Sequence, residues 1–155
     1  MNEYDKYFMK FALKFAKLAE IDQEVPVGAV LVLDNTIIGR GSNSSITQND
    51  PTAHAEIIAL RTGGKFLKNY RLLSTTLYVT LEPCFMCYGA IIHSRISRLV
   101  FGTHYNNKSN YNVFNSHILR KIRKNKIIVT KNVMHEECKN ILQTFFKRKR
   151  KSNCI

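Results

Sequence analysis

The feature of the sequence that most constrains the fold is a pair of short motifs, HAE and PCFMC, each at the start of an expected helix. The first contains His54 and Glu56, and the second contains Cys84 and Cys87. Pro83 favours a helix start, which would put both cysteines in a first turn, where their sulfurs can face one point and the helix dipole favours thiolates. His54 joins them only if the two helix starts meet, and we expect this to require that the preceding strands lie side by side.

The cysteine pair alone leaves several kinds of chemistry open. A lone CxxC also occurs as a thioredoxin-like redox pair or as half of a structural zinc site, but a structural site normally closes with four protein ligands and the sequence has no second CxxC. Together with His54, Cys84 and Cys87 supply three ligands and leave one position open for water. This is the pattern of a catalytic zinc site, with one Zn²⁺ per chain. Glu56 is then placed to carry protons rather than to bind the metal.

The remaining pattern predicts an α/β layered domain, because strands and helices alternate after an initial hairpin. Apolar residues at spacings of three and four predict an amphipathic helix over the first twenty residues. Asp34 and Asn35 tolerate the positive φ of a tight turn between two β-rich runs. The expected strands are 27–33, 36–40, TTLYVTL, RISRLVFG and NKIIVT, and the expected helices are 52 to a stop at Gly63 and Gly64, 83–94, and 134–149, with Asp50 or Thr52 capping the first of these three.

Length and charge narrow the class of protein. The 155 residues predict a single domain, 1–155, with a basic, frayed C-terminal tail at 146–155. The sequence has no apolar run long enough to span a membrane and no secretory signal, so we expect a cytoplasmic protein without a membrane partner. Lys and Arg outnumber Asp and Glu by 24 to 11, and the net charge of +13 suits a polyanion such as nucleic acid. The alternative is a lysine-rich proteome from an A/T-biased genome.

The sequence resembles the bacterial tRNA-specific adenosine deaminases over nearly its whole length. Its two motifs match HxE…PCxxC, the known signature of zinc nucleobase deaminases, and EVPVGAVLV, NDPTAHAEI, NYRL, TLYVTLEPC, IHSRI and VFG stand in family order and spacing. The resemblance implies the three-layer cytidine deaminase-like fold, a five-stranded mixed sheet between helices, with one Zn²⁺ per chain, no organic cofactor and a homodimer. It also implies hydrolytic deamination of adenosine to inosine at the wobble position of a tRNA, on a base splayed out of the anticodon stem-loop.

The same resemblance implies the roles of the motif residues. His54, Cys84 and Cys87 would bind zinc. Glu56 would act as general base and acid, passing a proton to N1 of the adenine ring and then to the departing amine.

Contacts to the substrate follow from the resemblance as well. Asn43 matches the asparagine that hydrogen-bonds the flipped base in the family, and Val27 matches a position of the pocket wall. The alternatives are a turn asparagine and a core valine. Phe145 and Phe146 match aromatic residues of the terminal helix near the anticodon loop, and we expect at least one of them in the core.

The loop after VFG departs from the family pattern. Tyr105 occupies the place of an aspartate in a loop that touches nucleic acid in the family, and the Gly- and Ala-rich stretch that follows there is absent. Tyr105 would either stack on a base or be an ordinary surface tyrosine. In the tail, Arg148 and Arg150 would neutralise phosphates, unless the tail is merely solvated.

Two other functions share parts of this pattern. A deaminase of free cytidine or guanine would use the same zinc motif, although the basic C-terminal helix and the extent of the match favour tRNA. A non-catalytic zinc-containing RNA-binding module would need neither Glu56 nor an open coordination position. Activity on free nucleosides would favour the first alternative, and a closed zinc site would favour the second.

Overall fold

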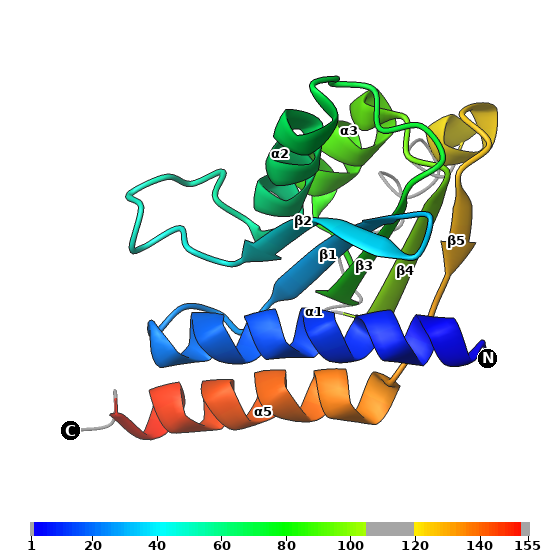
Figure 1. Ribbon diagram of the computed structural model, residues 1–155. Coiled ribbons are helices and arrows are strands. Elements are labelled where there is room, and N and C mark those ends of the chain that lie inside the picture. The colour runs from blue at the N-terminus through cyan, green and yellow to red at the C-terminus, as the bar shows by residue number, and fades with distance from the viewer. Residues whose placement is uncertain (1, 105–119, 153–155) are drawn as a thin grey trace.

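A five-stranded mixed sheet lies between two layers of helices in the computed structural model, which describes residues 2–104 and 120–152 (Figure 1). Across the sheet the strands are β2 (Thr36–Ser42), β1 (Gly28–Leu33), β3 (Thr76–Leu81), β4 (Arg98–Thr103) and β5 (Ile128–Thr130). The β1–β2 and β1–β3 pairs are antiparallel, whereas β3–β4 and β4–β5 are parallel. The predicted α/β class and mixed five-stranded sheet are confirmed.

The tight turn between β1 and β2 has the predicted geometry. Asp34 and Asn35 have φ values of 46° and 60°. Positive φ at both central residues gives a turn whose twist matches that of the flanking strands, and short polar side chains tolerate it best. The hairpin prediction is confirmed, although β2 continues to Ser42, two residues past its predicted end.

Alternate side chains of β1 face the two helical layers. Ala29 and Leu31 belong to the core shared with α2 (Ala55–Leu67) and α3 (Phe85–Ser94), whereas Val30 and Val32 pack with residues of α1 (Glu3–Ile21). This period of two is the ordinary consequence of strand geometry. In Figure 1, α1 and α5 lie side by side on one face of the sheet, and α2 and α3 cover the other. α5 spans His135–Ser152.

The predicted stop of α2 at Gly63 and Gly64 is wrong. Both glycines lie inside the helix, which ends after Leu67 where Lys68 takes a left-handed conformation with φ 50°. A Cβ atom at Gly63 would lie 2.3 Å from Cδ2 of Leu31 in β1. The glycine therefore serves the close approach of helix and sheet rather than a chain reversal.

The last helix is longer than predicted. α5 continues through Ser152, past the predicted end at Lys149, so it includes most of the segment expected to be a frayed tail. No helix in the described part of the chain is both long and apolar enough to cross a membrane.

A buried ion pair joins α1 to the sheet. Asp5 is 3 % exposed and accepts two hydrogen bonds from the Arg98 guanidinium, at 2.7 and 2.8 Å, and one from the Tyr78 hydroxyl at 3.0 Å. Arg98 also donates to Oγ1 of Thr130, at 2.9 Å. Burial opposes ionisation of Asp5, but the hydrogen bonds from Arg98 and Tyr78 outweigh it and hold the pKa of the carboxyl below its usual 3.8.

Replacing Asp5 with alanine should lower the free energy of unfolding at pH 7 by about 3 kcal/mol, the low end for breaking a buried pair, because the Arg98 side chain is 26 % exposed. Since the pKa of Asp5 is lowered by folding, its contribution is present above pH 3.8 and is lost as the pH falls through the lowered value. Urea unfolding of both proteins at pH 7 and pH 2.5 measures this. An equal gap at the two pH values would show that the charge of Asp5 is not what stabilises α1.

Candidate active site

Two helix starts meet at one edge of the sheet, although the strands that precede them are not neighbours. β2 and β3 both pair with β1, which lies between them, so the prediction that they lie side by side is wrong. Both run antiparallel to β1 and therefore end at the same edge. Gly41 in β2 lets α2 approach closely, because a Cβ atom there would lie 2.0 Å from the carbonyl oxygen of Ala55.

His54 and Cys84 occupy the N-cap positions of the two helices, and Glu56 and Cys87 lie in the first turns that follow. α2 begins at Ala55 with His54 as its N-cap residue, three residues later than predicted. Asp50 instead stabilises the preceding turn by accepting hydrogen bonds from the backbone N–H and hydroxyl of Thr52, at 2.8 and 2.7 Å. α3 likewise begins after the predicted Pro83, with Cys84 as its N-cap residue. Side chains at the N-cap and in the first turn lie near the end of a helix, so these three ligands lie where the two helix starts meet.

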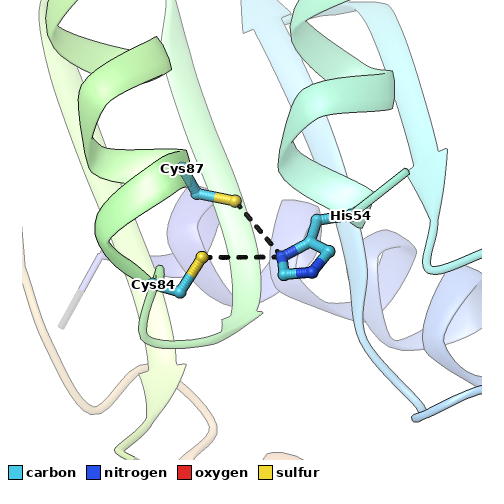
Figure 2. Close-up of side chains that lie close together, drawn as sticks. All are labelled: His54, Cys84 and Cys87. Atoms are coloured by element: carbon cyan, nitrogen blue, oxygen red, sulfur yellow. Dashed lines mark hydrogen bonds between the residues drawn. The ribbon is translucent and has the colours of Figure 1, made fainter. Parts of the chain in front are cut away.

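The histidine and the two cysteines form a compact cluster (Figure 2). Nδ1 of His54 lies 3.6 Å from Sγ of Cys84 and 3.5 Å from Sγ of Cys87. A tetrahedral zinc ion, with Zn–S near 2.3 Å and Zn–N near 2.0 Å, places sulfur and nitrogen ligands about 3.5 Å apart. The three residues therefore fit one zinc ion by donor type and by spacing.

The electrostatics of the cysteine pair also favour a metal cation. The hydrogen bond from Cys87 lowers the pKa of Cys84 to about 5, with further contributions from the backbone N–H groups of Cys87 and Met86. The same hydrogen bond, together with burial, raises the pKa of Cys87. Both shifts arise from one hydrogen bond, which the Cys87 thiol donates to the sulfur of Cys84. A bound dication would favour the thiolate form of both cysteines.

Glu56 lies beside the cluster and is 4 % exposed. Burial raises the pKa of its carboxyl to about 7, and the nearby Cys84 thiolate adds to this effect, whereas its own backbone N–H and His54 oppose it. A dication held by the neighbouring ligands would favour the carboxylate and lower this pKa. Burial and a bound dication therefore act on the pKa of this carboxyl in opposite directions, and a carboxyl group beside the metal ligands can serve as both general base and general acid.

A cavity of about 230 Å³ opens onto the cluster. Asn43 and Val27 lie on its wall with His54 and Glu56, so the structure brings together these four residues named from the sequence. Val27 is also part of the core, at 7 % exposed. The complete wall consists of Val25, Val27, Asn43, His54, Glu56, Leu81, Glu82, Cys84 and Phe146.

The aromatic residue on the cavity wall is Phe146. Phe145 is buried, at 5 % exposed, and contacts the Phe146 ring edge-on with the ring centroids 5.5 Å apart. Phe145, named as a substrate contact from the resemblance, is therefore placed behind a residue that lines the cavity. The spacing of apolar residues along α5 could have indicated which of the two phenylalanines faces the core. The residues that surround each ring do not follow from sequence.

Two carboxylates near the cavity were not predicted. Glu82 lines it and pairs with Nδ1 of His104 at 2.9 Å, while the Tyr88 hydroxyl donates to Glu82 at 3.4 Å. Glu24, in the connection between α1 and β1, is 1 % exposed and bonds to the segment after β2. The contacts of Glu24 reach across 19 to 23 positions of the chain, so no local pattern signals them.

The basic residues named from the sequence lie on α5. Arg148 forms an ion pair with Glu20 of α1, and Arg150 is exposed. Tyr105 lies outside the described residues.

A mixed five-stranded sheet whose helix starts bring together one histidine, two cysteines and a buried glutamate is the architecture of a zinc-dependent nucleobase deaminase. Residues 2–103 match the family described as the cytidine and deoxycytidylate deaminase zinc-binding region. The chain is 64 % identical to the tRNA-specific adenosine deaminase of Buchnera aphidicola subsp. Baizongia pistaciae, over 97 % of this chain and 93 % of the relative. It is 53 % identical to the tRNA-specific adenosine deaminase of Haemophilus influenzae, over 99 % and 90 %.

A solved structure from studies of A-to-I editing by tRNA:A34 deaminases at the wobble position of transfer RNA matches with a TM-score of 0.80 and 38 % identity, over 88 % of this chain and 99 % of that one. The chain belongs to the tRNA-specific adenosine deaminases, within the zinc-binding cytidine deaminase family.

Proposed function

We propose that this protein converts adenosine to inosine at the wobble position of a tRNA anticodon. The observation that carries the proposal is the arrangement of Glu56 and a zinc-type ligand set on one small cavity, in a chain 64 % identical to a tRNA-specific adenosine deaminase. The cavity, at about 230 Å³, is smaller than the usual range for drug-sized ligands and suits a single base rather than a length of nucleic acid. A base of the anticodon loop can be splayed into it without disrupting a duplex.

His54, Cys84 and Cys87 would hold the zinc ion. When bound, zinc supplies Lewis-acid activation of water at neutral pH. Two thiolates offset its charge, so a carboxylate is needed to remove the proton. Glu56 takes that proton and delivers it to N1 of adenine as the C6–O bond forms. It then takes the remaining proton from the hydroxyl on C6 and passes it to the exocyclic amine, so that the C6–N bond breaks, C6=O forms and ammonia leaves. Each transfer uses the same buried carboxyl, whose burial excludes competing proton donors from solvent.

The cavity wall would bind the base. Val27 and Phe146 provide apolar contact, with Phe145 supporting Phe146 from the core. The side-chain amide of Asn43, also on the wall, can hydrogen-bond an edge of the ring. We assign Tyr105 to the surrounding RNA contacts because it stands where the resembling family has an aspartate in a loop that touches nucleic acid. Exchanging it for aspartate should change the preference among RNA hairpins.

The test is incubation of the zinc-loaded protein with a tRNA pool, followed by sequencing for adenosine read as guanosine at the wobble position. Free adenosine, cytidine and guanine serve as competing substrates in parallel reactions. Deamination of the free compounds but not of tRNA would overturn the proposal in favour of a nucleobase-salvage enzyme. Binding of tRNA without any inosine would favour a non-catalytic zinc module.

Replacing Arg148 and Arg150 together with alanine should weaken binding to the anticodon stem-loop and reduce the dependence of log K on log salt by about 1 to 2, because each neutralised phosphate contributes about 0.7 to 0.9 to that slope. Most of the change should come from Arg150, since Arg148 is already paired with Glu20. Affinity titrations at several salt concentrations measure the slope. Lys124→Ala, at an exposed site outside α5, is the control, and an unchanged slope in the double variant would show that the end of α5 is only solvated.

The protein would act as a homodimer in the cytoplasm, where its tRNA substrate resides. In support of the dimer, a groove of about 710 Å³ lies between α2 and α3 and has an apolar floor. Tyr70, which also lines the groove, is 70 % exposed. A second copy of this chain would cover the floor formed by Ile57, Leu60, Met86 and Ala90. Sedimentation equilibrium should give twice the 17.9 kDa of one chain, and a monomer at all concentrations would contradict the proposal.

A further inference from the structure

Glu24 is a carboxylate buried in the connection between α1 and β1. It is 1 % exposed, and among residues 2–104 and 120–152 no lysine or arginine forms an ion pair with it. Burying an unpaired carboxylate is costly unless hydrogen bonds replace its hydration. Its hydrogen bonds therefore indicate what the residue is for.

One oxygen of Glu24 holds the segment that follows β2. Oε1 accepts hydrogen bonds from the backbone N–H groups of Ile46 and Thr47, at 2.7 and 2.9 Å, and from the Thr47 hydroxyl at 3.2 Å. These bonds fix the segment from Asn43 to Asn49 against the connection between α1 and β1. They account for one oxygen only.

The other oxygen faces the cavity residue Asn43. Oε2 of Glu24 accepts a hydrogen bond from Nδ2 of Asn43, at 3.4 Å, and the backbone N–H of Asn43 donates to the carbonyl oxygen of Val27, at 3.0 Å. A carboxylate only accepts hydrogen bonds, so it selects the nitrogen end of the amide. The amide of Asn43 can therefore take only one of its two flipped orientations beside Glu24.

The chemistry of adenine gives this orientation a purpose. The ring nitrogens N1, N3 and N7 are all acceptors, and the only donor on the base edge is the amine that leaves in the reaction. An amide that recognises the ring must therefore donate. Nδ2 of Asn43 carries two N–H groups, of which Glu24 takes one, so the second is available to the base.

We propose that Glu24 is a positioning residue for base recognition, which turns the amide of Asn43 so that its N–H₂ end serves an acceptor nitrogen of the adenine ring. This inference rests on the proposed function, because it assumes that an adenine base occupies the cavity. Glu24 itself lies behind Asn43 and is not among the residues of the cavity wall.

Glu24→Gln separates orientation of the amide from anchoring of the segment. The glutamine carbonyl can replace Oε1 and keep the bonds to Ile46 and Thr47, but its NH₂ group replaces Oε2. The NH₂ group of the glutamine then faces the NH₂ group of Asn43, and two donors cannot bond. The amide of Asn43 therefore flips, and its oxygen takes the position beside the base that Nδ2 held. Glu24→Ala removes both functions.

The experiment compares the two variants for activity, for base-dependent affinity and for backbone protection. Glu24→Gln should lower kcat/KM on an anticodon stem-loop by about 10- to 100-fold, the range for leaving a buried polar group unsatisfied. In the Asn43→Ala background the same change should add less than about twofold, because the residue through which it acts is gone. Hydrogen exchange at Ile46 and Thr47 should stay slow in Glu24→Gln and become fast in Glu24→Ala.

An affinity measurement without turnover gives an independent readout. In the inactive Glu56→Ala background, Glu24→Gln should weaken binding of a stem-loop with adenosine at the target position but leave binding of the same stem-loop with an abasic site unchanged. Equal losses with both RNAs, wild-type kcat/KM in Glu24→Gln, or a full effect in the Asn43→Ala background would each overturn the inference. Failure of the wild-type protein to deaminate the stem-loop would instead count against the proposed function.

Discussion

Replacing Glu56 with alanine should lower the rate of inosine formation by ~10² to 10⁴ while the protein keeps one zinc ion and its fold. The carboxyl is 4 % exposed beside the metal ligands and is positioned to move every proton of the reaction, so its loss removes base and acid together. Zinc should stay because none of His54, Cys84 and Cys87 is changed. The measurements are zinc content by atomic absorption and single-turnover inosine formation on an anticodon stem-loop.

Glu56→Gln is the matched control, because it keeps the shape of the side chain but cannot carry the proton. It should be nearly as inactive as the alanine variant, which would assign the loss to proton transfer rather than to an empty space in the cavity. RNA affinity should change little in either variant. Loss of zinc from Glu56→Ala, or retention of activity in Glu56→Gln, would contradict the assigned role.

The local features of the fold could be predicted because they depend on neighbours in sequence. The Asp34–Asn35 turn follows from the tolerance of these residues for positive φ, and the long first helix follows from its apolar spacing. Helix ends were less predictable. A glycine such as Gly63 often marks the end of a helix, but here it is needed because the helix backbone lies against Leu31, a residue more than thirty positions away.

Some features of the site could likewise be predicted from sequence, and others could not. His54, Cys84 and Cys87 could be named from sequence because metal ligation restricts both residue type and spacing. The strand order that brings these ligands together could not be predicted. β1 lies between β2 and β3, and the helix starts meet because those two strands run in the same direction. Glu24 carries no signature at all, because its partners are set by tertiary structure.

Replacing His54 with alanine should remove zinc, abolish deamination and lower the melting temperature. The thiolates of Cys84 and Cys87 remain, but two protein ligands are too few to hold zinc tightly. If zinc is present at about 1,000 times its dissociation constant, its binding stabilises the native state by about 4 kcal/mol. For a domain of this size that corresponds to roughly 10 °C in melting temperature. Zinc content and differential scanning calorimetry measure the two effects.

His93→Ala is the control, because His93 is exposed on α3, the helix that begins at the metal cysteines. It should keep zinc, activity and melting temperature, so that any loss in the His54 variant reports ligation rather than removal of a histidine. Adding a chelator should then lower the melting temperature of the wild-type protein toward that of His54→Ala without changing the variant. If His54→Ala keeps stoichiometric zinc, the metal is held elsewhere. The contacts of His54 Nδ1 with the two cysteine sulfurs, at 3.5 and 3.6 Å, would then be ordinary hydrogen bonds.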